Sequence, residues 1–201
     1  MTSILTLRPN VTFRDARRQF LSRDLRGVVS ALTKGPLQTL TDVYLPYRLY
    51  RVHILNGRAR QTHLFAVDSL RGELDLYHLP DSAPDKLISI NTRNHPLATL
   101  PEAQAKAMLI TKVERWLFLQ GFFRIQNLQL SADFLSAFHI PYWVGFFGRD
   151  GRLRLGAIDA VRRTHEGSKV VDLLSSWLSQ DSTITSMPNL TIESTANPVL
   201  R

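Results

Sequence analysis

The chain has 201 residues, of which 44% are apolar and 21% charged, the balance of a globular protein that buries its own core. Without cysteine it has no disulfide, no thiolate metal site and no cysteine nucleophile. No apolar run reaches the roughly 18 residues that a membrane span needs. The N-terminal residues lack a basic leader before an apolar stretch, so we expect a cytoplasmic protein.

The net charge of +8 comes entirely from the first third of the chain. Residues 1–63 hold eleven Arg and Lys against three Asp, whereas the rest hold fourteen basic and fourteen acidic side chains. Twenty of the 25 basic residues are Arg, which binds carboxylates and phosphates bidentately. A basic segment of this kind is typical of a surface for nucleic acid, anionic lipid or an acidic partner.

The first predicted element is a helix that begins at Thr12. Thr12 and Asp15 have the spacing of a capping box, and apolar residues follow at three- and four-residue steps. Gly27 is expected to bend or break this helix. It is predicted to end at the Gly-Pro pair of residues 35–36.

A β-hairpin is predicted over residues 44–68. Asn56-Gly57 is a pair preferred by two-residue type I′ turns, in which both central positions need positive φ. This turn would pair residue 50 with residue 63. Pro46 and Pro141 are expected in edge strands or at the first residues of strands, because proline cannot donate to a sheet ladder.

The second half of the chain repeats this order. Thr99 and Glu102 have the spacing of another capping box, which predicts a helix over 100–120. Another hairpin is predicted over 140–159, around Asp150-Gly151. The other predicted elements are strands at 72–79, 87–90 and 122–130, a helical turn at 131–138, a helix at 169–178, and a mobile polar tail at 179–201.

Both hairpins carry the same pattern of residues. The first has Leu45-Pro46-Tyr47, Gly57-Arg58-Ala59-Arg60 and Val67-Asp68; the second has Ile140-Pro141-Tyr142, Gly151-Arg152-Leu153-Arg154 and Ile158-Asp159. We therefore predict an α+β fold of two tandem units, residues 1–92 and 93–178. Each unit would combine a helix with antiparallel strands, and the two would share or pack their sheets.

The repeat suggests two interpretations of Asp68 and Asp159. One carboxylate from each half is how a shared-proton acid–base dyad is built, as in a hydrolase. Neither aspartate, however, is followed by the glycine that brings backbone amides onto a catalytic carboxylate in aspartic proteases. We therefore favour the interpretation that each aspartate ends a strand and accepts hydrogen bonds from a turn.

Arginine and aromatic residues of the hairpins are candidate binding residues. The arginine pairs would bind anionic groups, although charged residues at hairpin tips also keep sheet edges soluble. The aromatic residues would stack on nucleotide bases, although the interpretation we favour is that they form the core. The candidates are Arg58, Arg60, Arg152, Arg154, Tyr47, Tyr142 and Trp143.

The six histidines show no metal-ligand spacing. No phosphate-binding glycine loop or nucleophile motif occurs either. We therefore expect no metal, no cofactor and no enzymatic activity.

Residues 65–74, which run Phe-Ala-Val-Asp-Ser-Leu-Arg-Gly-Glu-Leu, resemble the end of PepSY-type repeats. Those are small cystatin-like α+β modules, often found in tandem in bacteria. The resemblance implies a binding or regulatory module, in some members linked to peptidase inhibition, without catalytic residues. The second half departs from the pattern, since Arg163 stands where the first half has Gly72.

Three hypotheses of function follow. The first is a non-enzymatic binding or regulatory protein that recognises a protein or peptide. The second is a nucleic-acid or anionic-ligand binder that uses the basic first third and the arginine tips. The third is a hydrolase with an Asp68/Asp159 dyad. The first is our prediction, because duplicated architecture comes without an assembled catalytic set.

Overall fold

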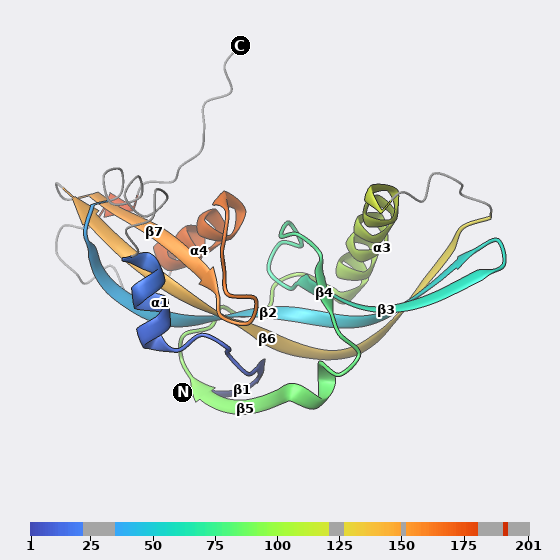
Figure 1. The fold of residues 1–201 in the computed structure, drawn as a ribbon, viewed down its shortest axis with the longest axis horizontal. Coiled ribbons are helices and arrows are strands. Elements are labelled where there is room, and N and C mark those ends of the chain that lie inside the picture. The colour runs from blue at the N-terminus through green and yellow to red at the C-terminus, as the bar shows by residue number, and fades with distance from the viewer. Residues whose placement is uncertain (22–34, 121–126, 150–151, 181–190, 193–201) are drawn as a thin grey trace, which may run out of the picture. The chain divides into compact units, whose positions relative to one another are not determined.

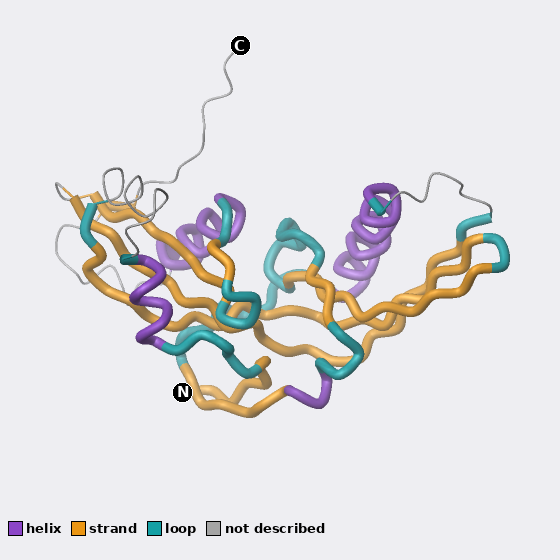
Figure 2. Tube along the Cα trace, in the orientation of Figure 1, coloured by secondary structure: helices purple, strands orange, loops and turns teal. Residues whose placement is uncertain are grey.

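The computed structural model describes residues 1–21, 35–120, 127–149, 152–180 and 191–192. Its α-helices and mixed β-sheet confirm the predicted α+β class (Figures 1 and 2). The helices are α1 (Phe13–Phe20), α3 (Glu102–Leu119) and α4 (Ser168–Gln180), with a short 3-10 turn at Pro84–Lys86. The strands are β1 (Thr2–Leu7), β2 (Leu37–Asn56), β3 (Ala59–Asp68), β4 (Tyr77–Leu79), β5 (Leu87–Thr92), β6 (Gln129–Arg149), β7 (Arg152–Asp159), β8 (Thr164–His165) and β9 (Thr191–Ile192).

The chain divides into two compact units that interleave along the sequence. Unit 1 consists of residues 1–8 and 44–140, and unit 2 of residues 9–43 and 141–201. The predicted boundary, by contrast, separated consecutive ranges at residue 92. Because of the interleaving, the positive charge is not confined to one unit. Unit 1 holds 12 basic and 8 acidic residues and unit 2 holds 13 and 9, so each carries +4.

Unit 1 is a sheet with the strand order β4-β3-β2-β6-β1-β5 and helix α3 against one face. Alternate residues of β2 and β3 point toward the helix, as the period of a strand requires. They meet the buried stripe of α3 in a core of Tyr50, Val52, Ile54, Phe65, Val67, Leu109, Val113, Leu117 and Ala132. None of the helices in the described residues is long and apolar enough to cross a lipid bilayer.

Unit 2 is built on the β6–β7 pair, which packs with α1 and α4. The short stripe of α1 provides Ala16 and Phe20 to its core. Ala16 clusters with Val11 and Ala160, and Phe20 with Phe147 and Ile158.

The two long strands correct several predictions. β2 has 20 residues and β6 has 21, about twice the upper range of ordinary strands. Pro46 and Pro141 therefore lie inside strands rather than at their starts. Residues 131–138, predicted as a helical turn, belong to β6, and β1 was not predicted at all. Of the predicted strand 72–79, only Tyr77–Leu79 pairs.

The turn of the first hairpin lies one residue later than predicted. Asn56 pairs with Ala59, so Gly57 and Arg58 form the turn. Gly57 has φ 60°, whereas Arg58 is not among the described residues with positive φ. That combination fits a type II′ turn rather than type I′. The resulting register pairs Tyr50 with Phe65 instead of residue 63.

One of the two predicted capping boxes is confirmed. Thr12 caps α1: its hydroxyl oxygen accepts the Asp15 N–H, and the hydroxyl donates to the Asp15 carboxylate. This bond from Thr12 lowers the pKa of Asp15. Thr99 is not a cap, because α3 begins after Pro101 and the Thr99 hydroxyl donates to Leu70 O. The predicted helix through 22–34, the Asp150-Gly151 turn, residues 121–126 and most of the predicted tail lie outside the described residues.

Each hairpin is joined to the helix from the other half of the chain. In unit 1, Ser69 O accepts the N–H groups of Thr99 and Leu100, which lead into α3. In unit 2, Ala160 O accepts the N–H groups of Asn10 and Val11, which lead into α1. The first hairpin thus packs on the second helix of the sequence, and the second hairpin on the first helix.

Candidate functional site

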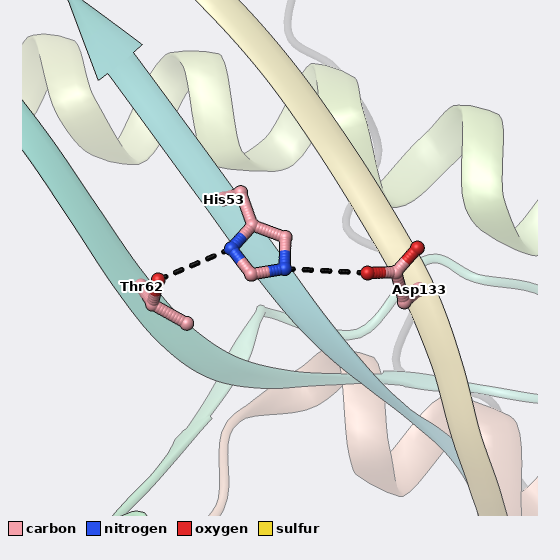
Figure 3. Close-up of polar contacts among 3 residues, drawn as sticks. All are labelled: His53, Thr62 and Asp133. Carbon is pink, nitrogen blue, oxygen red and sulfur yellow. Dashed lines mark hydrogen bonds and ion pairs between the residues drawn. The ribbon is translucent and has the colours of Figure 1, made fainter.

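The open face of the unit 1 sheet carries a row of polar side chains across three strands. Residues on this face alternate with those that pack under α3. His53 on β2 lies opposite Thr62 on β3, and Asp133 comes from β6 on the other side of β2. Figure 3 shows the imidazole of His53 between the Thr62 hydroxyl and the Asp133 carboxylate.

Both ring nitrogens of His53 have partners. Nδ1 lies 3.1 Å from Thr62 Oγ1, and Nε2 lies 3.2 Å from Asp133 Oδ2. A carboxylate only accepts, so Nε2 carries a proton, and in the neutral ring Nδ1 then accepts from the Thr62 hydroxyl. The contact orients the ring but contributes little stability, since the side chains of His53 and Asp133 are 46% and 66% exposed.

A groove of about 450 Å³ lies on this face beside His53. Arg60 provides a guanidinium group, and hydroxyl and amide side chains provide further donors. No Asp or Glu is among its lining residues in the described part of the chain. These are His53, Ile54, Leu55, Arg60, Gln61, Thr62, Gln129, Leu130 and Ser131. The groove therefore suits an anionic group with a small apolar neighbour.

The outer edge of β3 is open next to the groove. β4 pairs only with residues 64–66 of β3, and β2 occupies the other side of β3 along its whole length. Within the described strands, the Ala59–His63 edge thus has no neighbour. Such an edge presents backbone donors and acceptors to an added strand.

The row Thr62–His53–Asp133 has the residue types of a nucleophile, a base and an orienting acid. Catalysis by such a set relies on exclusion of water, which strengthens the electrostatics of the site. His53 and Asp133 are instead widely exposed. We therefore interpret the row as a fixed set of hydrogen-bonding side chains on a binding surface.

Asp68 is enclosed by the loop that follows it. The carboxylate is 1% exposed, and its Oδ1 accepts the N–H groups of Leu70, Arg71 and Gly72 at 3.3, 2.9 and 2.8 Å. Oδ2 accepts the N–H of Leu74 at 3.0 Å. This bonding supports the structural interpretation of the aspartate.

Asp159, with no exposed surface, occupies the same position in unit 2. Its Oδ1 accepts the N–H groups of Val161 and Arg162 at 2.7 and 2.8 Å. The two aspartates belong to different units, and each carboxylate is bonded to its own loop. Their bonding thus supports turn acceptors rather than a dyad.

The predicted arginine candidates lie in different surroundings. Arg60 lines the groove, whereas Arg58 lies exposed in the turn and does not. Arg154 on β7 is half-buried. The side chain of Arg152 lies outside the described residues.

The predicted aromatic candidates are core residues in large part. Tyr47 and Tyr142 are each 2% exposed, which leaves no ring face for a base. Trp143 is half-buried and donates its indole N–H to Val11 O at 2.8 Å. These contacts favour packing over stacking on nucleotides.

Sequence reasoning missed most of the site. Asp133 and Ser131 were assigned to a helical turn, and the predicted hairpin register moved His53 away from Thr62. Setting the turn at Gly57-Arg58 would have placed His53 opposite Thr62. A second unpredicted cluster joins His63, His78, Trp116 and Phe65, with ring centroids 4.9–5.8 Å apart.

The described residues contain no group of three or more His, Asp or Glu placed to hold a metal ion. Comparison of the chain with family models, with curated proteins and with solved structures gave no match. The PepSY-type resemblance therefore stays a prediction.

Proposed function

We propose that the protein acts in the cytoplasm by binding, without catalysis, and that its ligand is an acidic, extended segment of a protein or peptide. The observation that carries the proposal is the groove beside the open Ala59–His63 edge. Arg60 provides its positive charge, and the His53 imidazole adds a hydrogen-bonding ring beside it.

The open edge of β3 favours binding of an extended segment. Pairing with the edge of β3 would satisfy backbone groups of both chains, as in peptide recognition by strand addition. Alternate side chains of the segment would then point to the groove face. A Glu or Asp there would reach the guanidinium of Arg60, which lies on the strand next to the added one.

The test uses fluorescein-labelled decapeptides with alternating Glu and Val, and matched peptides with Gln in place of Glu. Fluorescence anisotropy at low salt should show preferential binding of the Glu peptides. Arg60→Ala should weaken this binding about ten-fold or more, because a charge-assisted hydrogen bond is worth about 1.5–3 kcal/mol.

Arg58→Ala is the matched control, since Arg58 is a neighbouring exposed arginine outside the groove. The affinity of this variant for the Glu peptides should stay within about two-fold of the parent protein's, because one solvated charge contributes little. Equal affinity for Glu and Gln peptides, or equal loss in Arg58→Ala and Arg60→Ala, would count against the proposal.

A second candidate function is binding of single-stranded nucleic acid by α1 of unit 2. Arg14, Arg17 and Arg18 are exposed on this helix. The charges of Arg18 and Arg163 both act on Asp15, so the loop after β7 adds a further arginine to this face. The ring of Phe13 is 50% exposed, and an exposed ring beside arginines is a stacking platform for bases.

This second candidate predicts that the affinity for a short oligonucleotide falls steeply as salt rises. Replacing both Arg17 and Arg18 by Ala should flatten the plot of log affinity against log salt. The same variant should bind the acidic peptides as before. Negligible binding of oligonucleotides at low salt would dismiss this candidate and would not affect the proposal that the groove binds acidic peptides.

A further inference from the structure

We infer that the two halves of the chain, residues 1–92 and 93–180, are two copies of one module joined as an exchanged pair, so that the required partner of each half is the other half. This inference concerns how the fold is held together and does not depend on the proposed ligand. It assigns an interaction surface to each half: the apolar stripe of its helix and the inner face of its hairpin.

The hydrogen bonds at the ends of the two hairpins are equivalent. Ser69 N–H donates to Pro46 O at 2.8 Å in unit 1, and Ala160 N–H donates to Pro141 O at 3.0 Å in unit 2. Tyr47 pairs with Asp68, as Tyr142 pairs with Asp159. One pattern of residues thus forms one local structure twice.

The docking of the helices is equivalent as well. The carbonyl directly after each aspartate accepts two consecutive N–H groups that lie two and three residues before a helix. When the two helices are aligned by these hydrogen bonds, Ala16 of α1 occupies the position of Ala105 in α3. Both alanines have no exposed surface. Phe20 and Leu109 match in the same way and are buried.

The long strands explain why the partners are exchanged. β2 begins beside α1 in unit 2 and continues into the hairpin of unit 1. β6 begins beside α3 in unit 1 and continues into the hairpin of unit 2. The first helix of each half therefore lies in one unit and the hairpin of that half in the other. This is the arrangement of a domain-swapped dimer.

In the described residues, the core of each unit takes residues from both halves, although α4 of the second half also packs on β7 of its own hairpin. Val52, Phe65 and Val67 come from the first half, but Leu109, Val113 and Leu117, which cover them, come from the second. In unit 2, Ala16 and Phe20 of the first half cover residues of β6 and β7. A hairpin without such cover is marginal in water, so separation of the halves would expose both cores.

The experiment cuts the folded chain between its halves. A recognition sequence for a specific protease is inserted between Leu97 and Ala98, which lie exposed between β5 and α3. After cleavage, size-exclusion chromatography at about 1 μM in native buffer should give one species with the mass of the uncut chain. The same sample in denaturant should separate into two fragments, which shows that cleavage is complete.

Variants of the cut protein test the helix contacts. Ala16→Lys and Ala105→Lys should each raise the dissociation constant of the two fragments at least ten-fold. Ala107→Lys, on the exposed face of α3, should leave it within two-fold. Separation of the cut parent into two folded fragments would overturn the inference, and so would a cut Ala16→Lys protein that stays as tightly paired as the parent.

Discussion

Arg163 has the same left-handed backbone conformation as Gly72, with φ 63° against 69°. Each lies four residues after the aspartate that ends its hairpin, where the loop bends back around a buried carboxylate. Glycine takes this conformation at no steric cost, whereas a side chain is strained there. The second loop thus keeps the conformation of the first without its glycine.

Arg163→Gly should stabilise the protein by about 1 kcal/mol, because it removes the strain of a side chain at positive φ. Urea denaturation followed by circular dichroism measures the change. Gly72→Ala should act in the opposite direction, since a side chain is strained at φ 69° and the added Cβ would also clash with Met108 Sδ. A loss of stability in Arg163→Gly would show that its side chain has a role that outweighs the strain.

Asp68→Ala should destabilise the protein by at least about 2 kcal/mol. The change would leave the buried N–H groups of Gly72 and Leu74 without their acceptor, and each unsatisfied donor costs roughly 1–3 kcal/mol. Asp68→Asn keeps one acceptor oxygen and should lose less stability than Asp68→Ala. A neutral Asp68→Ala, measured by the same denaturation, would contradict the structural role of this residue.

Tyr50→Phe should leave the stability unchanged or raise it by up to about 1 kcal/mol. The Tyr50 hydroxyl is fully buried and has no hydrogen-bond partner among the described residues. Burial raises the pKa of this phenol, in keeping with a hydroxyl removed from water. A buried polar group without a partner costs free energy, which phenylalanine avoids. A loss above about 1 kcal/mol would reveal a partner for the hydroxyl.

His139 should make the protein less stable in mild acid. Burial lowers the pKa of its imidazole below the usual 6.5, the bond to Leu5 O opposes this shift, and the neighbouring His95 adds to it. The unfolded chain then binds the proton more readily than the folded protein does. The stability contributed by neutral His139 is therefore complete above about pH 6.5 and declines as the pH falls through the pKa of the folded state.

The measurement for His139 is the free energy of unfolding by urea between about pH 5 and pH 8. His139→Gln should show a flatter dependence on pH below about 6.5 than the parent, because it removes the titrating group. Identical slopes in the two proteins would assign the acid sensitivity to other residues.

The sequence predicted the fold class, both hairpins and the positions of α3 and α4 because these depend on local patterns. Repeating apolar steps marked Leu109, Val113 and Leu117, and Gly57 marked the first hairpin turn to within one residue. The capping box at Thr12 is local as well and is confirmed. Asp68 and Asp159 were expected to accept turn hydrogen bonds, as they do.

What the sequence could not predict depends on contacts far along the chain. Pro46 ordinarily argues against a strand interior, yet its carbonyl accepts from Ser69 and β2 continues through it. The residues that lead into α1 bond to Ala160, about 150 residues away, and no local signal indicates which hairpin a helix will cover. The groove was missed for the same reason, since Gln129, Leu130 and Ser131 line it only because β6 pairs with β2.

The exchange of helices is the central claim, and amide hydrogen exchange on the full chain tests it most directly. Ala16→Lys should speed exchange in residues 152–160, in the other half of the sequence, and spare residues 59–68 in its own half. Ala105→Lys should do the reverse, because Ala16 is buried with Ala160 at the end of the second hairpin, and Ala105 is buried on α3, which packs on β3 of the first hairpin. Loss of protection in the hairpin of the same half as each substitution would contradict the exchanged arrangement.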